Sequence, residues 1–412
     1  MAAWREKPLG AVCQFINRGI SPAYLEHGGV AVLNQKCVRD HAINFDLGRR
    51  HDAAAKKVTP ERFLRAGDVL VNSTGTGTLG RVAQLREEPP EPTTVDSHVT
   101  VVRPVIGLFC PEFFGYALVA IEEQIQQGGE GCGGQTELSR SKLAETYRIR
   151  FPVELKAQHR IVTILNEAFE GIATAKANAE KNLQSARELY EGQLDSLFSS
   201  ASARWPERAL DQVATIINGF AFKSTDFQTT PGVRSIKITN VGVREFVEDP
   251  GNHLPASFAQ KHAGVAVAGG SIVLALTRTI IAGGLKVAVV PADFHGALLN
   301  QRVAAIQPRA TELESSFLFF HLSTRRVMDY VKSRVNTLMQ PNLSIADLRR
   351  LPLPMPPISE QRELVATLTG LDEESLRLES VYLRMLAALD ELKKSLLHQA
   401  FSGQLGKAVT LR

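Results

Sequence analysis

The sequence predicts an α/β (α+β) protein with a pseudo-twofold internal repeat. Two mixed α/β domains are separated by two long antiparallel helices that form a coiled coil. Three observations predict this. Residues 158–199 align without a gap with residues 361–402, at an offset of 203. Both segments lack proline and place apolar residues at helical spacing. Outside them, short apolar runs are bounded by glycine, proline, asparagine and aspartate, which is typical of strands.

The two aligned segments carry apolar residues at alternating steps of three and four, the spacing of a coiled-coil seam. In the second segment these are Leu364, Leu368, Leu371, Leu378, Tyr382, Met385, Leu389, Leu392 and Leu396. The polar Ser375 occupies the one remaining seam position. In the first they are Ile161, Leu165, Ala168, Ile172, Ala175, Ala179, Leu183 and Ala186. We expect the two stripes to bury each other, because a helix of about 60 Å would overhang a single domain. The alternative is that each helix packs on a separate domain.

The repeat extends beyond the helices, because the only two tryptophans, Trp4 and Trp205, open matching segments. We therefore expect globular domains at 1–152 and 204–357, each followed by a long helix, at 153–203 and 358–412. Predicted strands cover 69–71, 81–85, 99–102, 236–238, 272–276, 286–290 and 303–306, and predicted helices cover 110–126 and 314–333. Proline-bearing connectors, 151–152 and 351–357, fix the direction in which each long helix leaves its domain.

Composition places the chain inside the cell. The four cysteines, Cys13, Cys37, Cys110 and Cys132, form no C-x-x-C pair, which favours free thiols over disulfides or zinc. The sequence has no signal peptide and no apolar run of membrane-spanning length, so we expect a cytoplasmic protein. The net charge is +4, with the basic excess in the second globular part. A polyanion would therefore meet the globular parts rather than the slightly acidic helices.

No pattern in the sequence indicates catalysis or a bound cofactor. The run from Gly75 to Gly80 fits G-x-G-x-x-G, but a dinucleotide site needs a helix after the loop, and residues 81–85 resemble a strand. We interpret the run as a turn between strands. Walker A, amino-methylation and His/Cys metal-ligand patterns are absent from the sequence. We expect neither catalytic residues nor metal ligands in this chain.

Basic and polar residues collect in predicted loops, at the same strand ends in both halves. Arg and Lys can bind guanine edges or phosphates, and Asn and Gln can bind adenine edges. Each residue alone could be an ordinary solvated side chain, but the repetition predicts contact with DNA. The candidates are Arg49, Arg50, His51, Lys56, Lys57, Thr76, Arg81, Ser97, His98, Lys237, Arg278, Lys286, Gln301, Arg302, Arg334, Asn336 and Gln340.

The chain resembles the specificity subunits of type I restriction–modification enzymes over its full length. The resemblance is strongest in residues 353–362, Leu-Pro-Met-Pro-Pro-Ile-Ser-Glu-Gln-Arg, and 399–405, Gln-Ala-Phe-Ser-Gly-Gln-Leu. A weaker copy, Phe-Pro-Val-Glu-Leu-Lys-Ala-Gln-His-Arg, occupies 151–160 and has one proline where the other copy has several. This departure leaves the boundaries of the first helix open.

The resemblance implies a subunit without catalysis that reads double-stranded DNA through two target-recognition domains, one for each half of an asymmetric bipartite site. It also implies that the helices set the gap between the two half-sites on the DNA and that two methyltransferase subunits dock on these helices. Those subunits bind S-adenosylmethionine and methylate adenine, and restriction subunits complete an ATP- and Mg-dependent nuclease. Two alternatives are open: a structural adaptor, and a DNA-modifying enzyme whose site has no recognisable motif.

Overall fold

The computed structural model describes residues 3–129, 137–202, 204–249, 251–281, 283–334 and 342–405. The chain divides into two compact units, each with its own globular part. Unit 1 comprises Met1–Ala179 and Arg384–Arg412, and unit 2 comprises Glu180–Leu383. Among the described residues, no helix is both long and apolar enough to cross a membrane.

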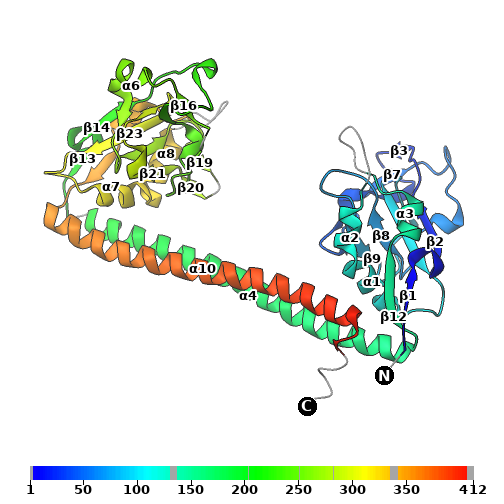
Figure 1. Ribbon diagram of the computed structural model, residues 1–412. Helices are drawn as coiled ribbons and strands as arrows, with labels where there is room; N and C mark the ends of the chain where they lie inside the picture. Colours follow the sequence, from blue (N-terminus) through cyan, green and yellow to red (C-terminus); the bar gives the residue numbers. More distant parts are fainter. Residues whose placement is uncertain are drawn as a thin grey trace, which may run out of the picture. The chain divides into compact units, whose positions relative to one another are not determined.

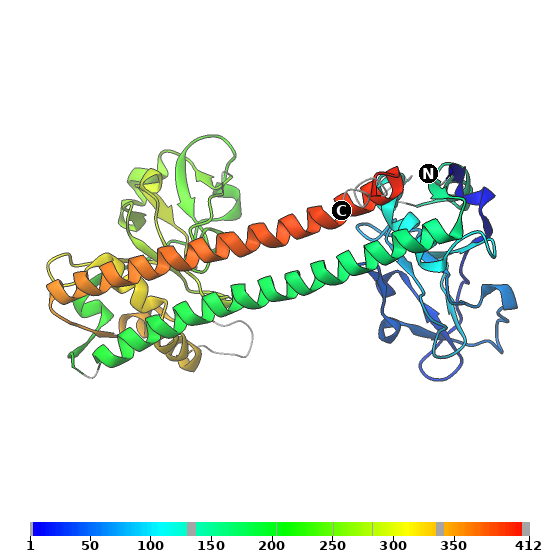
Figure 2. The same cartoon turned by 90° about the horizontal axis from the view of Figure 1, so that it is seen from below.

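The two long helices are α4 (Leu155–Ser202) and α10 (Ile358–Ser402). Within each unit their segments lie side by side (Figures 1 and 2). In unit 1, Leu165 shares a core with Ala400, and further along α4 the Lys176 ammonium pairs with Asp390 at 2.7 Å. The residue numbers of the α10 partners fall as those along α4 rise, so the two segments are antiparallel. In unit 2, α4 is joined to α10 by the Arg187–Glu379 ion pair at 2.8 Å.

The predicted seam is confirmed for α4, where the buried side chains include Leu165, Ile172, Ala179 and Leu183. In α10 the prediction is wrong at two positions. Met385 and Leu392 are 43% and 47% exposed, and the less exposed positions after Tyr382 include Leu386, Leu389, Lys393 and Leu396. The shift by one residue follows from helix geometry, because a straight helix has 3.6 residues per turn and drifts away from a strict seven-residue repeat.

The globular part of unit 1 is built on an antiparallel sheet in the order β2-β11-β8-β9 (Figure 1). Its strands are β2 (Cys13–Arg18), β11 (Val99–Pro104), β8 (Val69–Asn72) and β9 (Val82–Gln84). Successive side chains of a strand point to opposite faces. Val69 and Val71 therefore join the core under α1 (Pro111–Ala120), whereas Leu70 joins the core on the opposite face. With both faces covered, β8 is buried throughout.

A second sheet, β10-β4-β7-β3, covers that opposite side of unit 1. Its strands are β10 (Thr93–Val95), β4 (Val30–Leu33), β7 (Arg49–His51) and β3 (Tyr24–Leu25). β4 and β10 run parallel. The chain enters the globular part through β1 (Trp4–Pro8) and leaves it through β12 (Arg148–Pro152), and these two strands pair antiparallel.

Unit 2 repeats this arrangement. Its antiparallel sheet has the order β14-β23-β18-β21, with β14 (Ala214–Asn218), β23 (Val303–Pro308), β18 (Ile272–Ala275) and β21 (Val287–Val289). A parallel pair, β15 (Val233–Ile236) and β22 (Ala297–Leu299), matches β4 and β10. The flanking strands β13 (Glu207–Ala209) and β24 (Pro352–Pro354) match β1 and β12. The internal repeat is therefore present in the fold.

Three predicted elements differ from the structure. The helix predicted at 110–126 is two helices, α1 and α2 (Glu122–Gln127), and the one predicted at 314–333 is α7 (Ser315–Leu322) and α8 (Arg325–Arg334). The second break lies at Thr324, whose hydroxyl donates to the His321 carbonyl at 2.7 Å. Ser and Thr side chains compete with helical hydrogen bonds in this way. The strand predicted at 236–238 ends at Ile236, and Ile238–Asn240 forms a 3-10 turn.

The glycine-rich run is a turn between strands, as predicted. It connects β8 to β9, which pair antiparallel, and no helix follows it. Gly75, Gly77 and Gly80 have φ values of 103°, 76° and 82°, which glycine adopts without strain. A Cβ atom on Gly80 would also lie 2.7 Å from the backbone nitrogen of Gln126. The glycines therefore serve the turn, and the nucleotide-site interpretation remains rejected.

Candidate nucleic-acid interface

One end of the unit 2 sheet gathers several of the predicted DNA-binding residues. Arg278 follows β18, Lys286 precedes β21, and Gln301 and Arg302 precede β23. These three strands are neighbours and antiparallel, with Ala275 opposite Val303 and Leu274 opposite Val287. The end of β18 therefore meets the beginnings of β21 and β23. We call this group, Arg278, Lys286, Gln301 and Arg302, the unit 2 sheet-end cluster.

The cluster is held by backbone contacts and leaves most of its side chains in solvent. Arg278, Gln301 and Arg302 are exposed. The Arg302 carbonyl accepts from the Leu276 amide at 2.8 Å, so this residue is anchored through its backbone while its side chain stays available. Arg278 has a left-handed φ of 48°, which few non-glycine residues adopt. Strained backbone of this kind is often found where a side chain must point in a set direction.

Lys286 differs from its neighbours because its side chain is half-buried. Its ammonium donates to the Ile238 carbonyl at 2.7 Å. Burial lowers the pKa of Lys286, and the positive charge of Arg278 lowers it further. Lys237 lies on the strand end beside the cluster, since its neighbour Ile236 pairs with Leu299. Its ammonium lies 3.6 Å from the centroid of the Phe227 ring, and burial lowers its pKa as well.

The same end of the unit 1 sheet gathers the equivalent residues. Thr76 and Arg81 lie in the turn between β8 and β9, and Ser97 and His98 precede β11. We call these four residues the unit 1 sheet-end cluster. The Thr74 hydroxyl and the His98 Nδ1 are 2.7 Å apart, which links the two turns. Thr76 and His98 are exposed, and the Arg81 guanidinium donates to the Gly77 carbonyl at 2.9 Å.

The predicted cluster at 49–51 lies in strand β7 rather than in a loop, which corrects the expectation. His51 is fully buried, and its ring nitrogens contact backbone atoms of Ala23 and Lys56 at 2.7–3.2 Å. A buried, satisfied imidazole is unsuited to contact DNA directly. The Arg49 guanidinium lies 3.4 Å from the Tyr24 ring centroid, and Arg50 pairs with Glu91 at 2.6 Å.

The remaining candidates lie apart from the sheet ends or outside the described residues. Lys56 and Lys57 are exposed, and the Lys56 ammonium donates to the Ser21 carbonyl at 2.8 Å. Arg334 is exposed at the end of α8, with its guanidinium 4.0 Å from Asp347. Asn336 and Gln340 lie outside the described residues. Within the described ranges, no group of three or more His, Cys, Asp and Glu side chains could hold a metal ion.

The structure adds one residue that sequence reasoning missed. Phe220 is 45% exposed, although aromatic rings are usually buried, and its backbone bridges to Asn300, next to the unit 2 sheet-end cluster. Its ring lies 4.4 Å from the His262 ring. The Phe-Ala-Phe sequence at 220–222 was the available signal, but it equally fits a buried strand. Apolar side chains at such places can contact the thymine methyl group.

Comparison with known proteins agrees with this architecture. Residues 203–382 match the type I restriction modification DNA specificity domain. The specificity subunit of type I restriction enzyme MjaVIII from Methanocaldococcus jannaschii is 24% identical over 64% of this chain and 63% of its own. That of EcoAI from Escherichia coli is 29% identical over 40% of this chain and 28% of its own. The matches thus span less than two thirds of each of these relatives.

Two solved structures share the fold across nearly the whole chain. A chain from a study of complex assembly and conformational transition in a type I R-M system has a TM-score of 0.75 at 18% identity, covering 98% of this chain and 99% of its own. The HsdS subunit from Thermoanaerobacter tengcongensis has a TM-score of 0.53 at 18% identity, covering 97% of both chains. The domain match, the relatives and the shared fold all indicate similarity to type I restriction–modification specificity subunits.

Proposed function

We propose that the chain is the DNA-recognition subunit of a type I restriction–modification complex and reads an asymmetric, bipartite site. Each globular part, at 1–152 and 204–357, acts as a target-recognition domain for one half-site. The observation that carries the proposal is the pair of sheet-end clusters at equivalent places of the repeat. Their exposed side chains differ, with Thr76 and His98 in unit 1 but Arg278, Gln301 and Arg302 in unit 2. Different side chains select different bases, so the half-sites should differ.

The methyl transfer itself is assigned to partner subunits. Two methyltransferase subunits would bind S-adenosylmethionine and dock on the long helices, and restriction subunits would supply the ATP- and Mg-dependent nuclease. Exposed apolar side chains on these helices support docking, including Leu189 at 63%, Leu376 at 59% and Leu383 at 52% exposure. Exposed apolar side chains that gather in a patch mark protein–protein interaction sites, which supports a partner surface on these helices. We assign no catalytic step or cofactor to this chain, and place the complex in the cytoplasm.

The test is a reciprocal pair of substitutions, assayed with the methyltransferase by mapping methylated sites in genomic DNA. Arg302→Ala should relax base preference in one half-site only, and His98→Ala should do so in the other half-site. A well-placed base contact is worth about 1–3 kcal/mol of discrimination, so the relaxation should be roughly 5- to 150-fold. Arg377→Ala, which removes an exposed ion pair within α10, serves as the control and should leave both half-sites unchanged.

Several outcomes would overturn the proposal. Equal weakening on every DNA sequence would mean that Arg302 and His98 contact phosphates rather than bases. Methyl transfer by the purified chain without a partner would assign an enzyme activity to it. If the methyltransferase gains no sequence-dependent protection of DNA from this chain, the chain would instead be a structural adaptor.

A further inference from the structure

Each globular part has a hairpin that contacts a long helix through one side chain, and the two hairpins lie at equivalent places of the repeat. In unit 1 the hairpin is formed by β5 (Val38–Arg39) and β6 (Ala42–Ile43). In unit 2, Val241 bridges to Phe246, and this pair lies one repeat offset of 203 residues after Val38 and Ile43. At the matching turn position, His41 has a φ of 61° and Arg244 a φ of 59°. Two bulky residues thus hold a left-handed backbone conformation that costs energy and aims their side chains.

The Arg244 side chain touches both long helices of unit 2. Its guanidinium donates to the Asp372 carboxylate on α10 at 2.6 Å. The same group lies 4.7 Å from the centroid of the Tyr190 ring on α4. The Arg244 and Asp372 side chains are only 25% and 23% exposed, so water screens this pair less than a surface ion pair. One side chain therefore joins the globular part to α4 and α10 at once.

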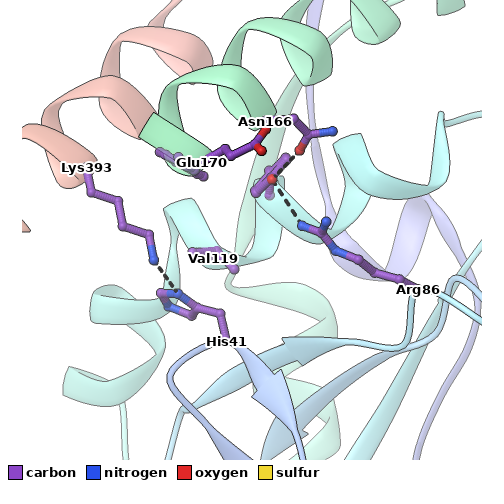
Figure 3. Close-up of a pocket in the computed structure, with 8 residues that line it drawn as sticks. His41, Arg86, Val119, Asn166, Glu170 and Lys393 are labelled. Atoms are coloured by element: carbon purple, nitrogen blue, oxygen red, sulfur yellow. Dashed lines mark hydrogen bonds between the residues drawn. The ribbon is translucent and has the colours of Figure 1, made fainter. Parts of the chain in front are cut away.

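His41, at the matching position of unit 1, reaches one long helix, α10 (Figure 3). Its Nε2 lies 2.5 Å from the Glu122 carboxylate, and its Nδ1 lies 3.4 Å from the Lys393 ammonium on α10. Because an ammonium only donates, Nδ1 accepts and Nε2 donates to Glu122. A cavity of about 410 Å³, lined also by Arg86 and Asn166, lies beside this contact. The unit 1 contact is therefore longer and less tightly packed than its counterpart.

In unit 2, this geometry adds a polar contact between the globular part and α10, far from the base of that helix. The base of α10 is already held by Gln361, whose side chain is buried and bonds to the Glu312 and Pro356 carbonyls and the Glu314 amide. Asp372 lies eleven residues further along α10, about 16 Å away. Between these two points the helices already pack on the unit 2 core through Tyr190, Leu194 and Leu368, so the Arg244 ion pair adds a directional contact at the far end of an apolar interface. Val243 of the hairpin also bridges to Val287, next to Lys286 of the unit 2 sheet-end cluster.

We propose that the two hairpins are latches that set the angle of each globular part on the helix segments of its own unit, and thereby enforce one gap length between the half-sites. His41 and Arg244 are positioning residues in this proposal, which rests on the DNA-recognition function proposed above. The hairpin in unit 2 contacts both α10 and the strand next to the sheet-end cluster. Loss of the latch would therefore let the orientation of this cluster relative to α10 vary. The bases that are read stay the same.

The test measures gap selectivity separately from base preference. Arg244→Ala, with the methyltransferase, is assayed on a plasmid library that carries the wild-type half-sites at gaps one and two base pairs shorter and longer than the preferred gap. The preference for the natural gap should fall about tenfold, which corresponds to about 1.4 kcal/mol. Base preference in both half-sites should be unchanged. Arg244→Lys should keep part of the gap selectivity. Lys393→Ala should lower the gap selectivity less than Arg244→Ala does, because the contact between Lys393 and His41 is longer.

Controls separate the latch from a general structural role. The charge swap, Arg244→Asp with Asp372→Arg, should recover gap selectivity, which a merely misfolded variant would not do. Arg377→Ala removes an exposed ion pair on the same helix and should have no effect. Unchanged gap selectivity in a folded Arg244→Ala variant would overturn the latch. If the wild-type chain directs no bipartite methylation at all, the proposed function fails instead. If Arg244→Ala does not fold, Asp372→Asn gives the same comparison.

Discussion

At the scale of single residues, buried polar side chains at repeated positions hold the helices to their globular parts. Gln158 and Gln361 are both fully buried at the offset of the repeat. Gln158 accepts from the Cys110 amide at 2.8 Å and donates to the Pro152 carbonyl at 2.9 Å. A buried amide or carbonyl group without a partner costs about 1–3 kcal/mol, so replacement by an apolar side chain would be costly at either position. Sequence alignment found this pair, and the structure supplies its role.

His321 makes unit 2 sensitive to acid. This residue of α7 is buried, and its Nε2 donates to the Pro352 carbonyl at 3.1 Å. Burial lowers the pKa of His321 to about 4. Because the folded pKa lies below the unfolded value of about 6.5, protonation favours the unfolded state. The stabilising effect is complete above pH 6.5 and is lost as the pH falls towards 4, at a cost on the order of 3 kcal/mol.

The measurement compares the free energy of unfolding of the wild type and His321→Gln at pH 7 and pH 4.5. Glutamine can still donate to the Pro352 carbonyl but does not titrate, so the acid-induced loss should be smaller in the variant. Carboxylates titrate equally in both proteins and cancel in the comparison. His398→Gln, at an exposed position of α10, is the matched control. Equal acid sensitivity of wild type and His321→Gln would contradict the prediction.

At the scale of elements, adjacent side chains of α10 differ in burial according to whether they lie in the seam. Leu386 is half-buried, whereas Met385 is 43% exposed, although heptad spacing assigned the seam to Met385. Leu386→Ala should therefore destabilise the protein by about 2 kcal/mol, and Met385→Ala by less than about 0.5 kcal/mol. Chemical denaturation of the two variants provides the comparison. If Met385→Ala lowered the free energy of unfolding more than Leu386→Ala, the seam would lie at the heptad position Met385 instead.

At the scale of the whole molecule, the proposed function assigns the gap between half-sites to the long helices. Insertion of seven residues after Ala179 in α4, matched by seven after Leu383 in α10, would preserve the seam phase. It would lengthen both helices by about 10 Å. Since successive base pairs of DNA are about 3.4 Å apart, the preferred gap should grow by about three base pairs while both half-sites keep their bases.

Methylation mapping with the elongated chain and its methyltransferase measures this gap directly. Insertion in α4 alone is the informative control, because it breaks the antiparallel pairing that joins Lys176 to Asp390 and Arg187 to Glu379. That variant should lose activity rather than acquire a new gap. An unchanged gap in the doubly elongated chain would mean that the helices do not measure the distance.

The sequence by itself determined the elements and their repetition. Two proline-free segments with apolar residues at helical spacing predicted α4 and α10, and short apolar runs predicted the central strands β8, β9, β11, β18, β21 and β23. These features depend on local periodicity, which is written along the chain. The internal repeat also matches Arg81 with Lys286 and His98 with Arg302, and these residues occupy matching strand ends.

Only the tertiary structure decided which side chains meet. His51 belongs to a basic run that reads as an exposed cluster, yet packing of β7 buries it. The contact from Arg244 to Asp372 joins residues 128 positions apart, and the aligned partner of Arg244 is a histidine, so neither periodicity nor residue type predicts the hairpin's role. Contacts between distant segments depend on how strands and helices pack together, and a one-dimensional pattern does not contain that information.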